Sequence, residues 1–287
     1  MTSPTTWFAP AKVNLYLHVT GRRPDGYHLL DSLVVFAGVG DKLGFACADG
    51  LSLKITGPGA KDLAVTDDNI VLKAARLLAE TLGRKPEAAI TLEKHLPVAS
   101  GIGGGSADGV AALRGLLKLW NSKLDEATLA KIGLKIGADL PVCLAGRPTQ
   151  MSGIGEILEP VVKLPPAWLV LVNPRIALST PAVFKARNGD FTPAAPLTAP
   201  PADAKSLAAV LTERRNDLAP PAIALEPSVG KMLDAIAATT DCLLSRMSGS
   251  GATCFGLYAD QATAENAAQT LANRHPNWWI APARILS

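Results

Sequence analysis

Residues 97–107 of the chain read Pro97-Val98-Ala99-Ser100-Gly101-Ile102-Gly103-Gly104-Gly105-Ser106-Ala107. Glycine loses the most backbone freedom on folding and is unfavourable inside helices and strands, so four glycines among five residues indicate backbone that approaches something closely. Residues 89–93 before the loop predict a strand, and the apolar residues at helical spacing from 110 to 120 predict a helix. This order places free N–H groups at a helix N-terminus, which is a binding site for phosphate.

The loop differs from two familiar phosphate-binding motifs. No Lys-Ser or Lys-Thr follows the glycines, as a Walker A loop requires, and Ser106 stands where the dinucleotide fingerprint needs a glycine. A flexible linker or a tight turn from strand to helix is the alternative for the glycines alone. The hydroxyl of Ser106 lies where it could reach a phosphate oxygen or a bound Mg²⁺.

A second polar cluster lies near the N-terminus. Lys12 and Asn14 lie on one face of a strand predicted from the alternation of residues 13–19, opposite its apolar side chains. Such a pair could hold a carboxylate or an anionic substrate, but the spacing alone favours a solvent-facing strand edge. Residues 21–26 predict a turn. Tyr27 and His28 follow it and could contact a planar ligand, although such a pair is more often structural.

Two later segments carry further candidates. Asp139 lies between small residues and an apolar run, which predicts partial burial, and a buried carboxylate needs a partner such as a lysine. A helix N-cap ahead of Leu140 and Pro141 is at least as compatible with Asp139. Residues 248–253 alternate Ser and Gly between two predicted strands, which fits either a hairpin turn or a loop that faces a nucleotide.

The composition limits the classes of protein that fit. The chain has 287 residues, 48% of them hydrophobic, and a formal net charge of +3 with scattered cations, which argues against disorder and against a nucleic-acid partner. The four cysteines form no C-x-x-C pair, so we expect buried thiols in place of a zinc site or disulfides. Residues 1–11 lack a signal-peptide pattern, and the apolar runs are too short for a membrane span. We therefore expect a cytoplasmic protein with no membrane partner.

The remaining pattern predicts an α+β chain. From residue 164 the sequence pattern changes, and residues 191–204 are a connection rich in proline and alanine. We predict two domains, residues 1–160 and 161–287. Strands are expected at 32–36, 51–56, 89–93, 168–172, 243–247, 253–258 and 278–285, and helices at 70–78, 110–120, 125–132, 206–214, 228–238 and 261–274.

Three motifs in this order resemble the GHMP kinase superfamily, named for galacto-, homoserine, mevalonate and phosphomevalonate kinases. They are Pro10-Ala11-Lys12, the glycine-rich loop, and Gly249-Ser250-Gly251-Ala252. The segments 10–15, 25–28 and 137–142 resemble one branch of it, which phosphorylates the 2-hydroxyl of a cytidine-diphosphate-linked methylerythritol in the non-mevalonate isoprenoid pathway. The resemblance runs from about residue 10 to residue 254.

This resemblance implies a two-lobed GHMP kinase fold with a mixed α+β C-terminal lobe and an N-terminal lobe like domain 2 of ribosomal protein S5. It implies ATP as phosphoryl donor, Mg²⁺ as cofactor with Ser106 as a contact, and a small-molecule cytidine-diphosphate substrate. The protein would be a monomer or a homodimer. The implied roles are catalysis for Lys12 and Asp139, ATP binding for residues 97–107, and substrate binding for Asn14, Tyr27, His28, Thr180 and Phe184.

The loop departs from the family pattern at three places. Ala99-Ser100-Gly101 replaces three glycines, Ala107 replaces a second serine, and Asp108-Gly109 follows where Asn or Asp and then Ala are common. Asp108 could help to hold Mg²⁺. None of these changes removes backbone donors, so we still expect ATP binding. Another kinase of the superfamily, of the homoserine or mevalonate type, and a non-catalytic nucleotide-binding module are the alternative functions.

Overall fold

The computed structural model describes residues 5–287, which divide into two compact units with interleaved sequence ranges. Unit 1 contains the described residues up to Ala11, Gly40–Val98 and Gly103–Gly146. Unit 2 contains Lys12–Val39, Ala99–Ile102 and Arg147–Ser287. Each unit thus combines several separate segments, whereas the predicted domains, residues 1–160 and 161–287, are continuous. That division stays a prediction.

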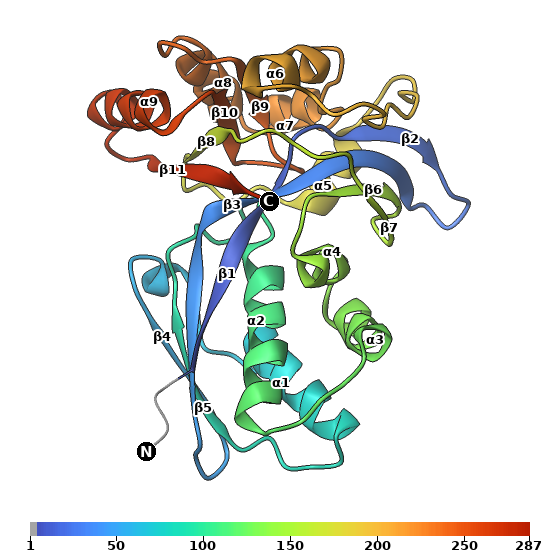
Figure 1. Ribbon diagram of the computed structural model, residues 1–287, viewed down its shortest axis with the longest axis vertical. Helices are drawn as coiled ribbons and strands as arrows, with labels where there is room; N and C mark the ends of the chain where they lie inside the picture. The colour runs from blue at the N-terminus through green and yellow to red at the C-terminus, as the bar shows by residue number, and fades with distance from the viewer. Residues whose placement is uncertain (1–4) are drawn as a thin grey trace. The chain divides into compact units, whose positions relative to one another are not determined.

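Two strands, β1 (Thr5–Asn14) and β3 (His28–Ala46), have residues in both units (Figure 1). In unit 1, the final residues of β3 pair antiparallel with β5 (Ala88–Glu93) over Lys42–Ala46, and β5 pairs parallel with β4 (Leu51–Thr56). The helices α1 and α2 pack against each other. The elements are β1 (Thr5–Asn14), β3 (His28–Ala46), β4 (Leu51–Thr56), the short 3₁₀ helix η1 (Ala60–Asp62), α1 (Ile70–Thr81), β5 (Ala88–Glu93), α2 (Gly104–Leu119), α3 (Glu126–Ile136) and α4 (Leu140–Ala145).

Local chemistry sets the positions of these helices. The cap of α1 is Asn69, whose side chain accepts a hydrogen bond from the N–H of Val71, rather than one of the two aspartates before it. Helix α2 lies very close to β3, because a Cβ added at Gly115 would stand 2.2 Å from the Phe45 ring. Glycine at this position therefore permits the helix to pack on the sheet.

In unit 2 the strands follow the order β3, β11 (Trp279–Leu286), β8 (Trp168–Asn173), β10 (Cys254–Tyr258) and β9 (Leu244–Met247), with neighbours antiparallel. The sheet continues beyond β3 through β2 and through the β6–β7 pair. The elements are β2 (His18–Arg22), β6 (Thr149–Gly153), β7 (Ile157–Pro160), β8 (Trp168–Asn173), α5 (Thr180–Ala186), α6 (Ala204–Thr212), α7 (Ala219–Leu225), α8 (Ser228–Ala237), β9 (Leu244–Met247), β10 (Cys254–Tyr258), α9 (Gln261–Arg274) and β11 (Trp279–Leu286).

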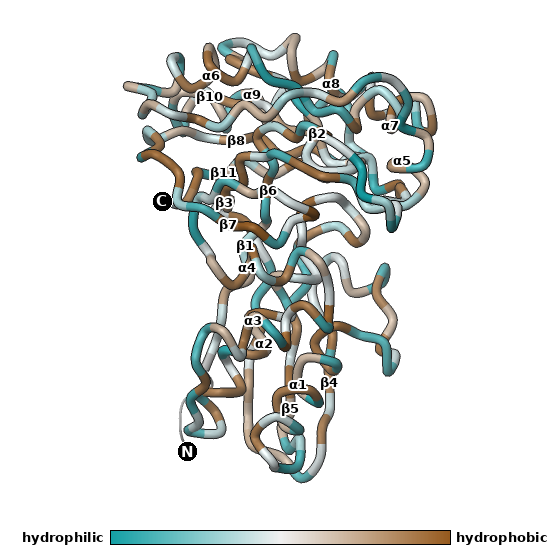
Figure 2. Tube along the Cα trace, turned by 90° about the vertical axis from the view of Figure 1, so that its right-hand side faces the viewer, coloured by the Kyte–Doolittle hydropathy of each residue, from teal (hydrophilic) through white to brown (hydrophobic). Residues whose placement is uncertain are grey.

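The core of unit 2 lies between one sheet face and three helices. Val170 and Val172 point from β8 to the same face as Cys254 and Tyr258 of β10, and side chains of α7, α8 and α9 pack on them. Hydrophobic residues recur along the elements of both units (Figure 2). The combination of helices with a largely antiparallel sheet confirms the predicted α+β class.

The structure differs from several sequence expectations. The predicted strand at 13–19 is interrupted, because β1 ends at Asn14 and β2 begins at His18. Cys47 is exposed, so the expectation of four buried thiols was wrong at this position. Among residues 5–287, no helix is both long enough and apolar enough to cross a bilayer. Elements that the sequence did not predict include η1, β6, β7, α5 and α7. All five are short, and α5 and α7 contain proline near their start.

Candidate functional site

The glycine-rich loop is divided between the two units. Ala99–Ile102 belongs to unit 2, whereas α2 begins at Gly104 in unit 1, six residues before the first apolar residue that predicted it. Gly103 occupies the N-cap with a φ of 62° and has no side chain to cap the helix. The first N–H groups of α2 are therefore left for a ligand, and the helix dipole favours an anion there.

The first half of the loop packs on the turn at residues 248–253 of unit 2. Thr253 N–H donates to Ser100 O (3.2 Å), and Ser248 Oγ donates to Gly101 O (3.3 Å). A Cβ added at Gly101, where φ is 74°, would stand 2.4 Å from Gly251 O, so only glycine fits. The turn is thus a hairpin between β9 and β10 and also a support for the loop. The alternative that it faces a nucleotide stays a prediction.

Ala99 also lies in left-handed backbone, with a φ of 50°. A residue with a Cβ loses about 1–2 kcal/mol in this region. The family pattern has glycine at this position, so the departure in this chain falls where the backbone favours glycine.

Lys12 and Asn14 end β1 and are both buried, with exposed fractions of 4% and 1%. The solvent-facing strand edge that the spacing favoured is therefore wrong. Lys12 Nζ donates to Asn14 Oδ1 (3.0 Å), and the backbone N–H of Lys12 donates to Ile102 O (2.9 Å). A buried ammonium on an amide oxygen beside the loop fits a site for anionic groups.

Asp139 lies in unit 1, directly before α4, and is partly exposed. It occupies the N-cap position of α4, but its side chain makes no cap hydrogen bond within the described part of the chain. The capping role that the sequence allowed is thus not what the side chain does in this structure. Its predicted catalytic role is not tested by this placement.

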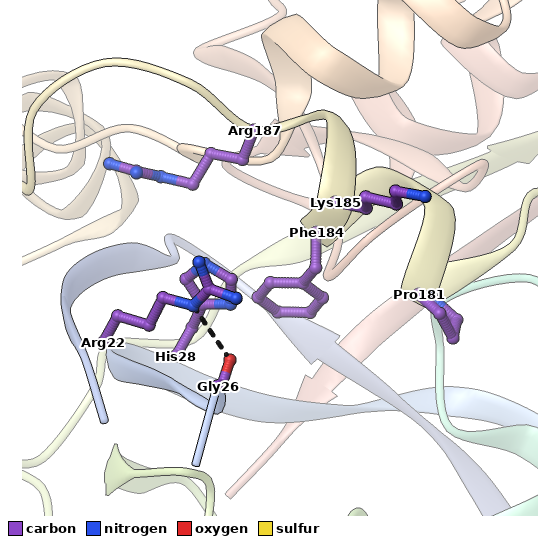
Figure 3. Close-up of a pocket in the computed structure, with 7 residues that line it drawn as sticks. All are labelled: Arg22, Gly26, His28, Pro181, Phe184, Lys185 and Arg187. Carbon is purple, nitrogen blue, oxygen red and sulfur yellow. Dashed lines mark hydrogen bonds between the residues drawn. The ribbon is translucent and has the colours of Figure 1, made fainter. Parts of the chain in front are cut away.

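A pocket of about 320 Å³ lies in unit 2 beside β2, β3 and α5 (Figure 3). The rings of His28 and Phe184 stack in it, with centroids 5.1 Å apart and planes inclined by 28°. The charged groups that line it, among residues 5–287, are all cationic. The lining residues are Arg22, Gly26, His28, Pro181, Phe184, Lys185 and Arg187. An aromatic stack with cations around it fits a planar base that is attached to negatively charged groups.

The cations of the pocket are positioned by the backbone around them. Arg22 Nε donates to Gly26 O (3.2 Å). Arg187 donates to the carbonyls of Gly189 and Asp190 and lies over the ring of Phe191. Burial lowers the pKa of His28, and the positive charges of Arg22 and Arg187 lower it further. The imidazole is therefore neutral near pH 7 and can both donate and accept hydrogen bonds.

The predicted substrate residues fall into three places within unit 2. His28 and Phe184 meet in the pocket, whereas the side chain of Tyr27, the residue before His28, is 61% exposed. Thr180 Oγ1 hydrogen-bonds Ser250 Oγ (2.7 Å), at the turn that supports the loop. Asn14 is with Lys12. The sequence did not single out Arg22, Lys185 or Arg187 as site residues, and their only local signal is a cluster of cations around Phe184 and the turn at 21–26.

A buried ion-pair cluster in unit 1 was also missed. Lys94 Nζ donates to Asp41 (2.5 Å) and to Asp108 Oδ2 (2.8 Å), and the backbone N–H groups of His95 and Leu96 donate to Asp41. A Cβ added at Gly104 would stand 3.4 Å from Lys94 Nζ, so this ammonium lies under the first turn of α2. The cluster joins β3, the end of β5 and the start of α2.

The ionisation and contacts of Asp108 bear on its suggested contact with Mg²⁺. Burial raises the pKa of Asp108 to about 7, although the Lys94 charge opposes the shift. Burial acts to lower the pKa of Lys94, but the charges of Asp108 and Asp41 outweigh it and raise the value. Asp108 Oδ1 is buried without a hydrogen-bond partner among the described residues. Within residues 5–287, no group of three His, Cys, Asp or Glu side chains could hold a metal. Asp108 Oδ2 is paired with Lys94, and the suggested Mg²⁺ contact of Asp108 stays a prediction.

Comparison with known proteins gives a consistent pattern. The family model described as GHMP kinases N terminal domain matches residues 69–147, and the model described as GHMP kinases C terminal matches residues 201–277. A protein of Paramagnetospirillum magneticum named 4-diphosphocytidyl-2-C-methyl-D-erythritol kinase is 65% identical over 97% of this chain and 98% of its own length. A protein of the same name from Rhodospirillum rubrum is 55% identical over 97% of this chain and 91% of its own length.

Solved structures are similar as well. A crystal structure of 4-(cytidine 5'-diphospho)-2C-methyl-D-erythritol kinase has a TM-score of 0.82 and 31% identity, and the match covers 99% of this chain and all of that one. A homoserine kinase from Cytophaga hutchinsonii has a TM-score of 0.72 at 20% identity, covering all of this chain and 95% of that one. At that identity the second likeness supports the fold alone.

Proposed function

The chain belongs to the GHMP kinases, in the branch of the 4-diphosphocytidyl-2-C-methyl-D-erythritol kinases, and we propose that it phosphorylates the alcohol for which that branch is named. In this reaction the 2-hydroxyl oxygen of 4-diphosphocytidyl-2-C-methyl-D-erythritol attacks the γ-phosphorus of ATP. The bond from that phosphorus to the bridging oxygen breaks, and ADP leaves. The product is the 2-phosphate, an intermediate of the non-mevalonate isoprenoid pathway.

The observation that carries the proposal is the pocket of unit 2. The stacked rings of His28 and Phe184 fit the cytosine base, and the neutral imidazole can hydrogen-bond its edge. Arg22, Lys185 and Arg187 supply positive charge for the attached diphosphate. Homoserine and mevalonate carry neither a base nor a diphosphate, so this pocket favours the cytidine substrate over those of the alternative kinases.

The glycine-rich loop supplies the site for the ATP phosphates. Gly103 leaves the N–H groups of α2 without a side-chain cap, and residues 97–107 bring further backbone donors. These groups fit a phosphate because they are fixed donors at a helix N-terminus. We assign the hydroxyl of Ser106 to the contact with Mg²⁺, which would supply positive charge to the ATP phosphates.

We assign the chemistry to Lys12 and Asp139. Asp139 takes the proton of the substrate hydroxyl or orients that hydroxyl for attack. Lys12 stabilises the negative charge on the transferred phosphoryl group and keeps the aspartate ionised. Both roles are electrostatic, as expected for phosphoryl transfer. Tyr27, Thr180 and Asn14 complete the proposed substrate contacts. A cytoplasmic location and the choice between monomer and homodimer also stay predictions.

Turnover with a panel of alcohols tests the proposed substrate. ATP consumption should be fast with 4-diphosphocytidyl-2-C-methyl-D-erythritol and slow with homoserine and mevalonate. Faster turnover of either simple alcohol would overturn the assignment.

A charge-removing variant tests whether the chain is a kinase or only a nucleotide-binding module. Asp139→Asn should bind ATP with nearly unchanged affinity and lose transfer by about 10²-fold or more. The exposed Asp68→Asn, in the same unit, is the matched control and should keep full activity. Near-normal transfer by Asp139→Asn would refute the role given to this aspartate.

A further inference from the structure

Ser32 is linked to Lys12 through the side chain of Asn14. Ser32 lies in β3 and has no exposed surface, and Lys12 and Asn14 end β1. Asn14 Nδ2 lies 2.8 Å from Ser32 Oγ, and Lys12 Nζ lies 3.0 Å from Asn14 Oδ1. The three residues belong to unit 2 and form one continuous series of hydrogen bonds.

The direction of each hydrogen bond in the series is determined. A serine hydroxyl has one hydrogen, and Ser32 donates it to the backbone carbonyl of Tyr16 (2.5 Å). Its oxygen can then only accept from Asn14, so the amide must present Nδ2 to Ser32. The other end of the planar amide, Oδ1, is thereby turned to the ammonium of Lys12. The hydroxyl of Ser32 thus decides which atom of Asn14 faces Lys12.

The main chain near this series is also held. Asn14 N–H donates to Ser248 Oγ (3.1 Å), and that hydroxyl donates to Gly101 O. Lysine has four rotatable side-chain bonds, so a fixed backbone does not fix its ammonium. A correctly oriented acceptor close to the ammonium does, and the Asn14 amide provides one.

We propose that Ser32 is a positioning residue for phosphoryl transfer, which acts by fixing the Asn14 amide so that its Oδ1 holds the Lys12 ammonium. The proposal rests on the proposed function, in which Lys12 stabilises the transferred phosphoryl group. Ser32 itself touches neither substrate in this role. Its loss should therefore lower kcat and leave the KM for ATP nearly unchanged.

The first experiment compares variants at position 32 by steady-state kinetics with ATP and the cytidine-diphosphate alcohol. Ser32→Ala should lower kcat about tenfold, since small misplacements of a catalytic group are costly, with the KM for ATP within about twofold. Ser32→Thr keeps the hydroxyl and suits a strand, so it should retain most of the activity. Ser245→Ala, which removes a serine hydroxyl bonded to the Leu233 carbonyl elsewhere in unit 2, is the matched control and should be normal.

The second experiment repeats the substitution in an Asn14→Ala background. If Ser32 acts through Asn14, Ser32→Ala should cause no further loss of kcat there. An equal loss in both backgrounds would show a merely structural role and overturn the proposal, as would normal kcat in folded Ser32→Ala. Should Ser32→Ala fail to fold, Ser32→Cys replaces it, because the thiol fills the space with a weak hydrogen-bonding group.

NMR of the Asn14 side-chain amide tests the hydrogen bond independently of turnover. In Ser32→Ala its two protons should exchange faster with solvent than in the wild type, and unchanged exchange would overturn the proposal. A wild-type protein that does not phosphorylate the cytidine-diphosphate alcohol would instead contradict the proposed function. The two failures are therefore distinguishable.

Discussion

The imidazole of His28 and the ring of Phe184 are stacked, with centroids 5.1 Å apart, although 156 residues separate them in the chain. His28 opens β3 and Phe184 lies in α5. The end of β2 and the end of α5 bring Arg22 and Arg187 to the same pocket. Aromatic surface and positive charge are thus combined from two distant segments of unit 2.

Removing the Phe184 ring should weaken binding of the cytidine substrate alone. Stacking of a base on an aromatic side chain contributes about 1–3 kcal/mol, so Phe184→Ala should raise the KM for the cytidine-diphosphate alcohol roughly 5- to 100-fold. The KM for ATP should stay unchanged. Phe8→Ala, at an exposed phenylalanine of β1, is the control in the same assay. An equal rise in both KM values would argue against a base in this pocket.

Removing a cation from the pocket should raise the pKa of His28. Burial is the largest cause of the lowered pKa of His28 and would remain in Arg187→Met. One of the two positive charges that lower the pKa further would be gone. An NMR titration of the imidazole should show a higher midpoint in this variant. Lys231→Met removes an exposed cation of α8 and should leave the midpoint of His28 unchanged.

The lowered pKa of His28 also predicts a pH dependence of substrate binding. Since the neutral imidazole is favoured, the KM for the cytidine substrate should be constant from pH 8 down to about 6.5, the ordinary histidine value. It should rise only at lower pH, as His28 becomes protonated. A rise that begins above pH 7 would contradict the lowered pKa.

The sequence predicted the loop and the longer elements because their signals are local. Periodicity over a dozen residues located α1 and α9. The start of α2 was placed too late, since Gly104 and Gly105 have poor helix propensity and nothing nearby revealed that the phosphate loop continues directly into the helix.

Partners that are distant in sequence explain the rest. Lys94 resembles an ordinary lysine at the end of a strand, and its partner Asp41 is 53 residues away. Alternation also misjudged the burial of Lys12 and Asn14. Reading burial from alternation assumes that only one face of the sheet is buried. In this protein Asn14 and Tyr16 are as buried as Val13 and Leu15. Contacts across the sheet decide these environments, and no short window of sequence contains them.

Breaking the Lys94 cluster should destabilise the protein. Lys94→Met leaves two buried carboxylates without their cation, which should cost about 3–5 kcal/mol in the free energy of unfolding measured in urea. Adding Asp108→Asn removes one of those carboxylates and should recover part of the loss. Strictly additive effects of the two substitutions would show that the side chains are not coupled.

Alanine at two glycines with left-handed backbone should separate steric fit from backbone strain. Gly83 and Gly101 have φ values of 64° and 74°, but a Cβ at Gly83 meets nothing within 4 Å, whereas at Gly101 it meets Gly251 O and Ser248 O. Gly83→Ala should therefore cost only the strain, about 1–2 kcal/mol in unfolding free energy, with normal kinetics. Gly101→Ala should cost more and should also raise the KM for ATP, because the first half of the loop must move off the turn that supports it. Equal costs and a normal KM in both variants would show that the loop does not depend on this close packing.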